Sequence, residues 1–309
     1  MSNNQPLVSV IIPSFNRADT VVLAIQSALD QEVPSIEVIV IDDGSSDHTQ
    51  QAVSGLHHPA VKFLRQKNSG ANVARNRGIE AATGAYIALL DSDDTFLPGH
   101  LARSVAHLRA NPSSAVFAKI IVDRGHGNTF LKPPRAPHAD EPISEYLSCA
   151  PGFVQTSTVV LPSEAAEKVR YLEWLPYGQD VDFAIRLEQA GFKLHMIQEP
   201  GAIWNDVKNG ARISAKTDPK VRMKWAIEER HLLTDRAFRG FTGWRVAKAY
   251  AENGKTMQGL LLWLRAAASG AYTPKHALVV FLQVLLAHGW YRKLADLRVK
   301  RSAKKVKEL

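Results

Sequence analysis

Short runs of apolar, mostly β-branched residues recur along the first part of the chain, and each ends abruptly in polar residues. The runs are 8–12 (VSVII), 36–41 (IEVIVI), 61–64 and 85–90 (AYIALL). Between them, as in 18–29 and 70–82, the residues follow a helical pattern, and a later stretch, 153–161, is strand-like. Continuous apolar strands that alternate with amphipathic helices are typical of parallel strands with helices on both faces. The sequence therefore predicts an α/β fold built on a mostly parallel sheet.

Three polar clusters follow three of these strands. They are Ser14-Phe15-Asn16-Arg17, Asp42-Asp43-Gly44-Ser45 and Asp91-Ser92-Asp93-Asp94. In sheets of this kind, ligands bind at the carboxyl ends of the strands. We therefore expect the three clusters to converge on one edge of the sheet and to form one ligand site.

The acidic cluster at 91–94 predicts a metal site. Carboxylates this close in sequence repel one another unless a cation or hydrogen-bond donors lie between them. Hard divalent cations bind carboxylate oxygens and keep positions open for phosphate oxygens. We therefore expect Asp91, Asp93 and Asp94 to belong to a site for a hard divalent cation and a diphosphate. The alternative is an acidic turn that caps the next helix.

The turn at 42–45 supplies a second pair of carboxylates. Asp42 or Asp43 can accept hydrogen bonds from a base N–H or from ribose hydroxyls. Gly44 allows the backbone to turn sharply close to a ligand. Asp-Gly-Ser-Ser is also good capping chemistry for a helix expected over 47–53, so both interpretations are open.

Four motifs together resemble the family 2 glycosyltransferases with a GT-A fold. They are VSVIIPSFNR at 8–17, IDDGSSDHT at 41–49, NSGANVARNRGIEAATGAYIALLDSDD at 68–94 and YGQDVDFAIRL at 177–187. Their order and approximate spacing agree with those of the family over about residues 7–215. The resemblance implies a GT-A sheet, a nucleotide-sugar donor and transfer of the sugar to an acceptor hydroxyl.

The resemblance also implies roles for single residues of the donor site. Pro13, Ser14 and Phe15 would line the pocket for the base and the ribose. Asp43 would read the base, and Arg75 would face the diphosphate or shape the donor pocket. The other residues assigned to nucleotide-sugar binding are Arg17, Asp42, Asn68, Gly70, Asp91 and Ser92.

The resemblance further implies the metal ligands and the catalytic base. Asp91 would face the ribose and the donor sugar, while Asp93 would hold Mg²⁺ or Mn²⁺, with Asp94 as the other candidate ligand. Asp180 resembles the family's catalytic base, with Asp182 as its rival. An inverting transfer needs a base for the acceptor hydroxyl and a cation for the leaving diphosphate. Asp180 could instead cap the helix expected over 180–190.

Two positions depart from the family pattern. Gln179 stands where the family usually has Glu, so the contribution of that neighbour to a raised pKa of Asp180 is expected to be smaller. The segment 204–214 (WNDVKNGARIS) lacks the His that many relatives have there. Lys208 or Arg212 could neutralise diphosphate oxygens instead. The alternative is a surface loop that happens to be basic.

The pattern is helical throughout from about residue 218. We therefore expect a catalytic domain over 1–215 and an all-helical C-terminal region over 216–309. The apolar stretch 277–287 is too short to span a bilayer, which needs about 20 residues. We expect it to form a helical hairpin with the region of 260–264.

The end of the chain is strongly basic. Residues 290–309 contain eight Lys and Arg residues against two acids, which is most of the formal net charge of +8. The rest is close to neutral, so nucleic-acid binding is not expected. Basic and aromatic residues beside an apolar helix fit contact with an anionic membrane surface, and the alternative is a solvated chain end.

The start of the chain does not resemble a secretory signal, and the single cysteine, Cys149, implies no internal disulfide and is expected to be a packing residue. We therefore expect a cytoplasmic protein, peripheral on the inner face of a membrane. The predicted function is metal-dependent, inverting transfer of a sugar from a nucleotide sugar, with UDP favoured, to a glycan or lipid-linked glycan of a surface polysaccharide.

Two alternatives belong to other classes. A nucleotidyltransferase would also use paired carboxylates and a metal, but it would be expected to carry a Gly-rich basic loop near its N-terminus, and none follows the first strand. A catalytically inactive, glycosyltransferase-like nucleotide-binding or scaffold protein is the second alternative. In that case Gln179 would mark the loss of catalysis.

Overall fold

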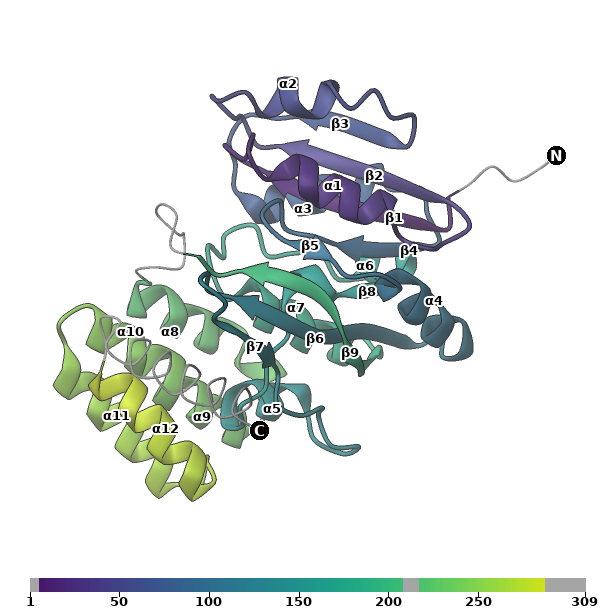
Figure 1. The fold of residues 1–309 in the computed structure, drawn as a ribbon. Coiled ribbons are helices and arrows are strands. Elements are labelled where there is room, and N and C mark those ends of the chain that lie inside the picture. The colour runs from purple at the N-terminus through teal and green to yellow at the C-terminus, as the bar shows by residue number, and fades with distance from the viewer. Residues whose placement is uncertain (1–5, 208–216, 287–309) are drawn as a thin grey trace, which may run out of the picture. The chain divides into compact units, whose positions relative to one another are not determined.

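The computed structural model describes residues 6–207 and 217–286 and divides the chain into two compact units (Figure 1). Unit 1 comprises Met1–Val122 and Val154–Asp206, and unit 2 comprises Asp123–Phe153 and Val207–Leu309. The segment 123–153 thus groups with the C-terminal helices, although it interrupts unit 1 in the sequence. The domain boundary expected near residue 215 falls in 208–216, outside the described residues.

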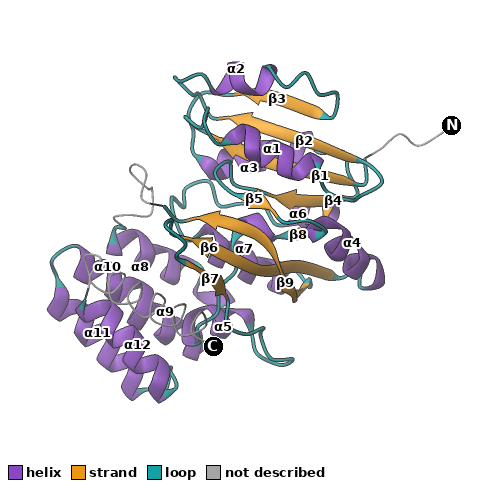
Figure 2. Ribbon diagram, viewed as in Figure 1, coloured by secondary structure: helices purple, strands orange, loops and turns teal. Residues whose placement is uncertain are grey.

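Unit 1 is built on a mixed sheet whose strands follow the order β3-β2-β1-β4-β8-β6-β9-β5. The first four strands of the chain pair in parallel, whereas β4–β8, β6–β8 and β5–β9 are antiparallel pairs (Figure 2). The strands are β1 (Val8–Ser14), β2 (Ile36–Asp42), β3 (Val61–Arg65), β4 (Tyr86–Leu89), β5 (Thr95–Phe96), β6 (Ser114–Asp123), β8 (Val160–Pro162) and β9 (Lys193–Asn205). The predicted α/β architecture is confirmed, and the parallel part is confined to β1–β4.

Helices cover both faces of the parallel part. The chain moves outward from β1 to β3 and then returns to β4 on the other side of β1, so right-handed connections place α1 and α2 on one face and α3 on the other. All seven residues of β1 are buried as a result. The helices of unit 1 are α1 (Val21–Leu29), α2 (Thr49–Ser54), α3 (Ala71–Ala81), α4 (His100–Ala110), α6 (Ser163–Lys168) and α7 (Gln179–Gln189).

A glycine allows α3 to pack closely on β1. A Cβ atom added at Gly78 would lie 2.4 Å from Cγ2 of Ile11, so a larger residue would push the helix away from the strand. This matters for function because α3 also carries Arg75 one turn earlier. The close packing therefore fixes the position of Arg75 relative to the edge of the sheet.

One predicted strand is wrong in its first part. The stretch 153–161 reads as a strand, but it forms a short 3-10 helix, η1 (Thr156–Thr158), before β8 begins at Val160. The backbone N–H of Ser157 donates to the Gln155 side chain, and the Thr158 hydroxyl donates to the Gln155 carbonyl. Such local side-chain bonds compete with a strand ladder and turn the backbone instead.

Unit 2 is mainly helical. Its elements are β7 (Thr129–Lys132), α5 (Ile143–Cys149), α8 (Pro219–Glu228), η3 (Arg230–Leu232), α9 (Asp235–Phe241), the π-helix η4 (Thr242–Val246), α10 (Ala247–Glu252), α11 (Thr256–Ala268) and α12 (Pro274–Leu285). The predicted hairpin is confirmed, since Trp263 of α11 donates to the Ala277 carbonyl of α12 at 3.0 Å. Cys149 is buried and unpaired, as predicted. Within the described residues, no helix has the length and apolar character needed to cross a bilayer.

Candidate active site

The polar clusters that follow β1, β2 and β4 lie at one edge of the sheet of unit 1. These strands are parallel neighbours, and Ser14 at the end of β1 is in register with Asp42 at the end of β2. The Arg17 guanidinium, from the loop after β1, lies 3.4 Å from the Asp93 carboxylate, from the loop after β4. The structure therefore brings the three clusters together, as expected from the topology.

Arg75 holds one end of the acidic motif. It is only 3% exposed, and its Nη2 donates to Asp91 Oδ1 at 2.7 Å while its Nη1 donates to Asn72 Oδ1 at 3.2 Å. The guanidinium also lies 5.2 Å from the centre of the Tyr171 ring. Burial opposes its charge, but the nearby Asp91 carboxylate outweighs this and raises the pKa of Arg75 above its usual value. Arg75 is therefore a fixed, permanent cation that orients Asp91.

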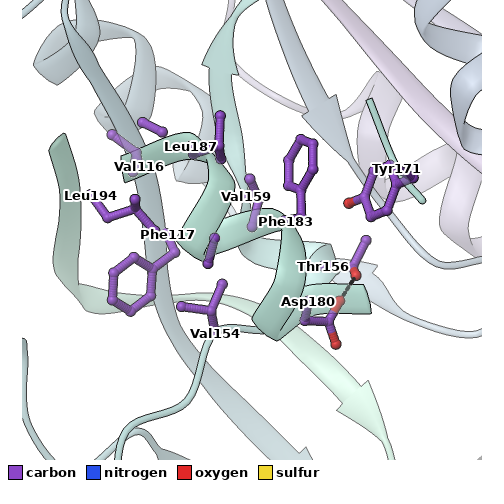
Figure 3. A pocket seen from close by; sticks show the side chains of 12 residues that line it. Val116, Phe117, Val154, Thr156, Val159, Tyr171, Asp180, Phe183, Leu187 and Leu194 are labelled. Atoms are coloured by element: carbon purple, nitrogen blue, oxygen red, sulfur yellow. Dashed lines mark hydrogen bonds between the residues drawn. The ribbon is translucent and has the colours of Figure 1, made fainter. Parts of the chain in front are cut away.

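Asp180 lies at the start of α7 and faces Thr156 (Figure 3). The helix begins after Gly178, which has φ 82°, and no side chain caps it. The alternative that Asp180 merely caps this helix is therefore wrong. The Thr156 hydroxyl instead donates to Asp180 Oδ1. Both side chains line a pocket whose other walls are mainly apolar and include Phe117, Val154, Val159, Tyr171, Phe183, Leu187 and Leu194.

The environment of Asp180 favours its protonated form more than water does. Burial, opposed by the Thr156 hydrogen bond and the charge of Arg75 and aided by the charge of Asp91, raises the pKa of Asp180 to about 6. A carboxylate with this pKa is still ionised at neutral pH and is a stronger base than an ordinary aspartate. Because burial is the main cause, the raised pKa does not depend on a Glu at position 179. Gln179 therefore does not remove the raised pKa of the candidate base.

Asp182, the rival base, is in a different environment. Its side chain is fully buried, and Oδ2 accepts from Arg186 Nη2 at 2.6 Å and from Nε at 2.9 Å. Arg186 lies one turn further along α7, so the pair spans positions i and i+4 of the same helix. Two arginine donors occupy Oδ2, and the side chain has no exposed surface, so this carboxylate is not available to an acceptor hydroxyl. The geometry thus separates the two aspartates and favours Asp180 as the base.

The two candidate metal ligands also differ sharply. Asp94 is 2% exposed, and three donors occupy its oxygens: Asn205 N at 3.1 Å, Ser157 Oγ at 2.6 Å and Gln155 Nε2 at 3.0 Å. Burial, together with the charges of Asp91 and Asp93, raises the pKa of Asp94 well above its usual value. The side chain of Asp93, by contrast, is 40% exposed. Asp94 is therefore a buried carboxylate that bonds segments distant in the sequence, whereas Asp93 is the accessible carboxylate of the motif.

The accessible part of the acidic motif at 91–94 fits a metal site that substrate phosphates complete. Among residues 6–207 and 217–286, no three His, Cys, Asp or Glu side chains are grouped so that they could hold a metal alone. Mg²⁺ is commonly bound by one or two carboxylates together with substrate phosphates. An accessible Asp93 next to an oriented Asp91 meets this requirement.

Asp43 fixes the start of α3. Its Oδ1 accepts from Gln66 Nε2 at 2.7 Å and from Ser69 N at 2.9 Å, and its Oδ2 accepts from Gly70 N at 2.8 Å. The alternative that the 42–45 turn caps the next helix is wrong, because the N-cap residue of α2 is His48 and its first backbone N–H, that of Thr49, donates to Asp47 Oδ1 at 3.0 Å. Asp43 instead bonds the backbone N–H groups of Ser69 and Gly70 just before α3, because the loop of 66–70 folds over the turn.

Asp42 is buried beneath the same turn. Its side chain has no exposed surface, Oδ1 accepts from Ser45 N at 3.2 Å, and Oδ2 lies 3.4 Å from Arg65 Nε. Gly44 has φ 79°, and a Cβ atom there would lie 2.9 Å from Asn68 N, so this position requires glycine. Asp42 and Gly44 thus set the shape of the turn, above which the exposed Asn68 lies.

The comparisons with known proteins agree with this geometry. Residues 9–159 match the model of the family described as glycosyl transferase family 2. The amylovoran biosynthesis glycosyltransferase AmsB of Erwinia amylovora is 30% identical over 271 residues, which are 83% of this chain and 89% of that protein. This chain belongs to family 2 of the glycosyltransferases.

Two solved structures share the fold of the enzyme. Residues 1–349 of S. aureus TarS, in complex with UDP-GlcNAc, have a TM-score of 0.63 at 21% identity, with 96% of this chain and 91% of that chain covered. The mannosyltransferase PcManGT of Pyrobaculum calidifontis, in complex with GDP-Man and Mn²⁺, has a TM-score of 0.60 at 20% identity, with 98% and 87% covered. At this identity the likeness shows the GT-A fold alone.

The remaining predicted donor residues of the enzyme differ in exposure. Pro13, Ser14 and Ser92 are buried, whereas Phe15 is 44% exposed and Arg17 is also exposed. In the segment that departs from the family pattern, Trp204 is half-buried at the end of β9. Lys208, Arg212 and Ser214, as well as the basic end of the chain, lie outside the described residues.

The sequence interpretation missed several residues that hold the site together. Thr156 bonds Asp180, Ser157 and Gln155 bond Asp94, and Tyr171 packs against Arg75. The three polar residues belong to the stretch that was read as a strand. A cluster of Gln, Thr, Ser and Thr at 155–158 in an apolar run was a signal that this stretch turns and bonds locally.

Proposed function

We propose that the enzyme transfers a sugar from a nucleotide sugar to a hydroxyl of a glycan or lipid-linked glycan in surface polysaccharide synthesis, with inversion and with a divalent metal. One observation carries the proposal: buried Arg75 donates to Asp91 of the acidic motif, and its charge also acts on Asp180, a carboxylate with a pKa of about 6. A base and a site for a charged leaving group therefore share one edge of unit 1.

The relatives support the choice of substrates. AmsB is named for the biosynthesis of a polysaccharide, amylovoran. TarS was solved with UDP-GlcNAc, and PcManGT was solved with GDP-Man and Mn²⁺. We infer a nucleotide-sugar donor for this enzyme, with a UDP-sugar favoured, and Mg²⁺ or Mn²⁺ as the metal.

Asp93 is proposed as the main protein ligand of the metal, since its carboxylate is exposed while that of Asp94 is saturated by donors. When bound, the metal neutralises charge on the diphosphate that leaves. Asp91, oriented by Arg75, is proposed to face the ribose and the donor sugar. The positive charge of Arg75 reduces the repulsion between Asp91 and the neighbouring carboxylates.

Asp180 is proposed as the general base. The acceptor hydroxyl oxygen forms a bond to the anomeric carbon while the bond from that carbon to the diphosphate oxygen breaks, and the hydroxyl proton passes to Asp180. Because Thr156 already donates to Oδ1, we assign the proton transfer to Oδ2. Thr156 thereby holds the base in one orientation.

The donor pocket is proposed to comprise the predicted residues at the ends of β1 and β2 and the start of α3. Pro13, Ser14, Phe15, Arg17, Asn68 and Ser92 are proposed to contact the nucleotide sugar. Asp43 is proposed to act both on the base and, through its bonds to Ser69 and Gly70, on the loop that surrounds it. Asp42 is proposed to support the pocket from beneath.

The first test is calorimetric titration of UDP, GDP and dTDP, each with and without Mn²⁺. We expect one nucleotide to bind selectively and to bind about tenfold or more weakly without Mn²⁺ or to Asp93→Asn, because a charge-assisted contact is lost. Asp30→Asn, an exposed aspartate at the end of α1, is the matched control and should bind as the wild type does. Failure of all three nucleotides to bind would overturn the proposed donor site.

We also propose that the enzyme is cytoplasmic and associates with the inner face of an anionic membrane. Met257, Leu261 and Leu264 form an exposed stripe on α11, and Leu278 and Leu285 are exposed on α12. The sequence continues from α12 into the basic stretch of 290–309. Apolar residues beside Lys and Arg favour binding at the headgroup level of anionic lipid.

Co-sedimentation with vesicles of phosphatidylcholine and phosphatidylserine tests this location. We expect salt-sensitive binding that the double variant Leu261→Asp, Leu264→Asp weakens. The control is Leu131→Asp, an exposed apolar residue in β7. Equal sedimentation of all three proteins, or none, would exclude the proposed surface.

A further inference from the structure

Three cationic side chains are crowded together within unit 2. Arg222 lies on α8, Arg245 lies in the π-helix η4, and Lys248 lies on α10; these three elements pack on one another. Burial and the charge of Arg222 lower the pKa of Arg245 to about 10. Burial, together with the charges of Arg245 and Arg222, also lowers the pKa of Lys248, although Glu252 opposes this. The three groups are therefore close enough to repel one another.

Arg245 is the most unusual of the three. Within the described part of the chain it has no hydrogen-bond or ion-pair partner, and its Nε atom is buried without an acceptor. Its guanidinium lies 4.0 Å from the centre of the Trp244 ring, which gives it an aromatic contact but no counter-charge. A charged donor atom that is buried without an acceptor is costly, so a bound anion would stabilise the half-buried guanidinium of Arg245.

The neighbouring titratable groups do not compensate Arg245. Glu252 lies 3.6 Å from Lys248 Nζ, one turn along α10, and so pairs with that lysine. The Tyr272 hydroxyl donates to the Gly240 carbonyl at 2.6 Å, and burial raises its pKa, so it carries no charge. Burial and the charge of Arg245 lower the pKa of His276 to about 4, so His276 is neutral at physiological pH.

The cluster is built into the fold and is open to a ligand. The π-helical turn of Thr242–Val246 sets the direction of Arg245, and such turns are frequent at functional sites. The turn is held in place by Gly243, where a Cβ atom would lie 2.2 Å from Cβ of Ala266. The Lys248 side chain is 42% exposed, and Arg222 and Arg245 are half-buried. An anion can therefore reach the cluster from solvent.

We propose that Arg222, Arg245 and Lys248 form a binding site for a phosphate or diphosphate group, separate from the donor site of unit 1. Two arginines can bind phosphate oxygens with their forked N–H groups, and Lys248 adds a mobile point charge. The bound anion removes the repulsion among the three cations and provides Arg245 with a partner. The phosphate can belong to a membrane lipid headgroup or to a soluble phosphorylated ligand, and the site recognises the chemistry that both share.

Titration of inorganic pyrophosphate into the full-length enzyme tests the site. EDTA is included so that the metal-dependent donor site contributes little. We expect Arg245→Gln to bind pyrophosphate about tenfold or more weakly than the wild type, as for other charged contacts. The control Arg239→Gln removes the same charge from an exposed position of α9 and should leave the affinity unchanged. Binding of the donor nucleotide with Mn²⁺ should be equal in all three proteins, which separates this site from the proposed donor site.

A second arm identifies the source of the phosphate. Vesicles of phosphatidylcholine with phosphatidic acid are compared with plain phosphatidylcholine vesicles, using Arg245→Gln and Arg239→Gln. Weaker binding of Arg245→Gln to phosphatidic acid alone points to a lipid headgroup, and weaker binding to pyrophosphate points to a soluble ligand. If Arg245→Gln does not fold, Lys248→Gln, which changes the more exposed side chain, replaces it in the pyrophosphate titration and in the vesicle comparison. Equal binding by the cluster variants and the control in both arms would overturn the proposal.

Discussion

Arg75 in unit 1 is buried and Arg245 in unit 2 is half-buried, and the two arginines differ in their partners. Arg75 donates to Asp91 and Asn72, and its pKa is raised. Arg245 has no ion-pair partner among the described residues, and its pKa is lowered to about 10. The burial cost is compensated by the protein in the first case and is left uncompensated in the second.

The difference indicates two ways of preparing a site for a charged ligand. In unit 1 the charge of Arg75 is balanced by Asp91 in the folded protein. Asp91 and Asp180 are held in fixed positions by Arg75 and Thr156, so charge that develops during the reaction is met by groups that are already oriented. In unit 2 Arg245 lies near Arg222 and Lys248 and has no counter-charge of its own among the described residues, so an anion from outside would supply the missing interaction. The first arrangement suits catalysis, and the second suits binding.

The largest expected effect comes from removing the proposed base of unit 1. Asp180→Asn should lower kcat by about 10²–10⁴, the range typical of general-base catalysis, while binding of the donor nucleotide with Mn²⁺ is kept. Asp182→Asn is the matched control two residues away. It should lower stability, since it breaks the buried pair with Arg186, and leave kcat of the folded enzyme within a few-fold of the wild type. Initial rates with the identified donor, and urea unfolding, measure both; a larger kcat loss in Asp182→Asn would reverse the assignment.

The next effect tests the comparison of the two arginines directly. Asp91→Asn should lower the free energy of unfolding by about 2 kcal/mol, because it leaves the charge of Arg75 buried without its partner. Arg245→Gln should raise it by about 1 kcal/mol in phosphate-free buffer, because it relieves repulsion from Arg222 and Lys248. Urea unfolding of both variants at neutral pH shows whether each free energy of unfolding is lower or higher than that of the wild type. Destabilisation of similar size in both would mean that Arg245 is compensated after all.

A smaller effect is expected from pH. Because the pKa of Asp180 is about 6 and the base must be ionised, kcat/KM should be level above pH 7 and fall about tenfold per pH unit below 6. The folded state also holds this proton more tightly than the unfolded state, so the contribution of Asp180 to stability falls as pH rises from about 4 to 6. A pH–rate profile, with unfolding measured alongside, checks both directions. A profile that bends near pH 4 would show that burial does not shift this carboxylate.

The strands β1 to β4 and the clusters after them could be predicted because their signals are local. Each apolar run is continuous, and each cluster follows within a few residues of the strand end. The residues around Asp94 and Asp180 could not be predicted in the same way. Gln155 and Ser157 reach Asp94 from 61 and 63 residues away, and Asn205 reaches it from 111 residues away. Single polar residues in a sequence form no periodic pattern from which such long-range contacts can be predicted.

The sequence by itself determined the alternation of strands and helices, the order of the motifs and the placement of acids at the carboxyl ends of strands. Only the tertiary structure decided which acid of each pair remains accessible. Asp93 is exposed beside the buried Asp94, and Asp180 faces a pocket while Asp182 is held by Arg186. The physical reason is that the exposure and the pKa of a carboxylate depend on donors, charges and apolar neighbours that the fold brings in from distant segments. The residues next to each aspartate in the sequence do not distinguish the two members of a pair.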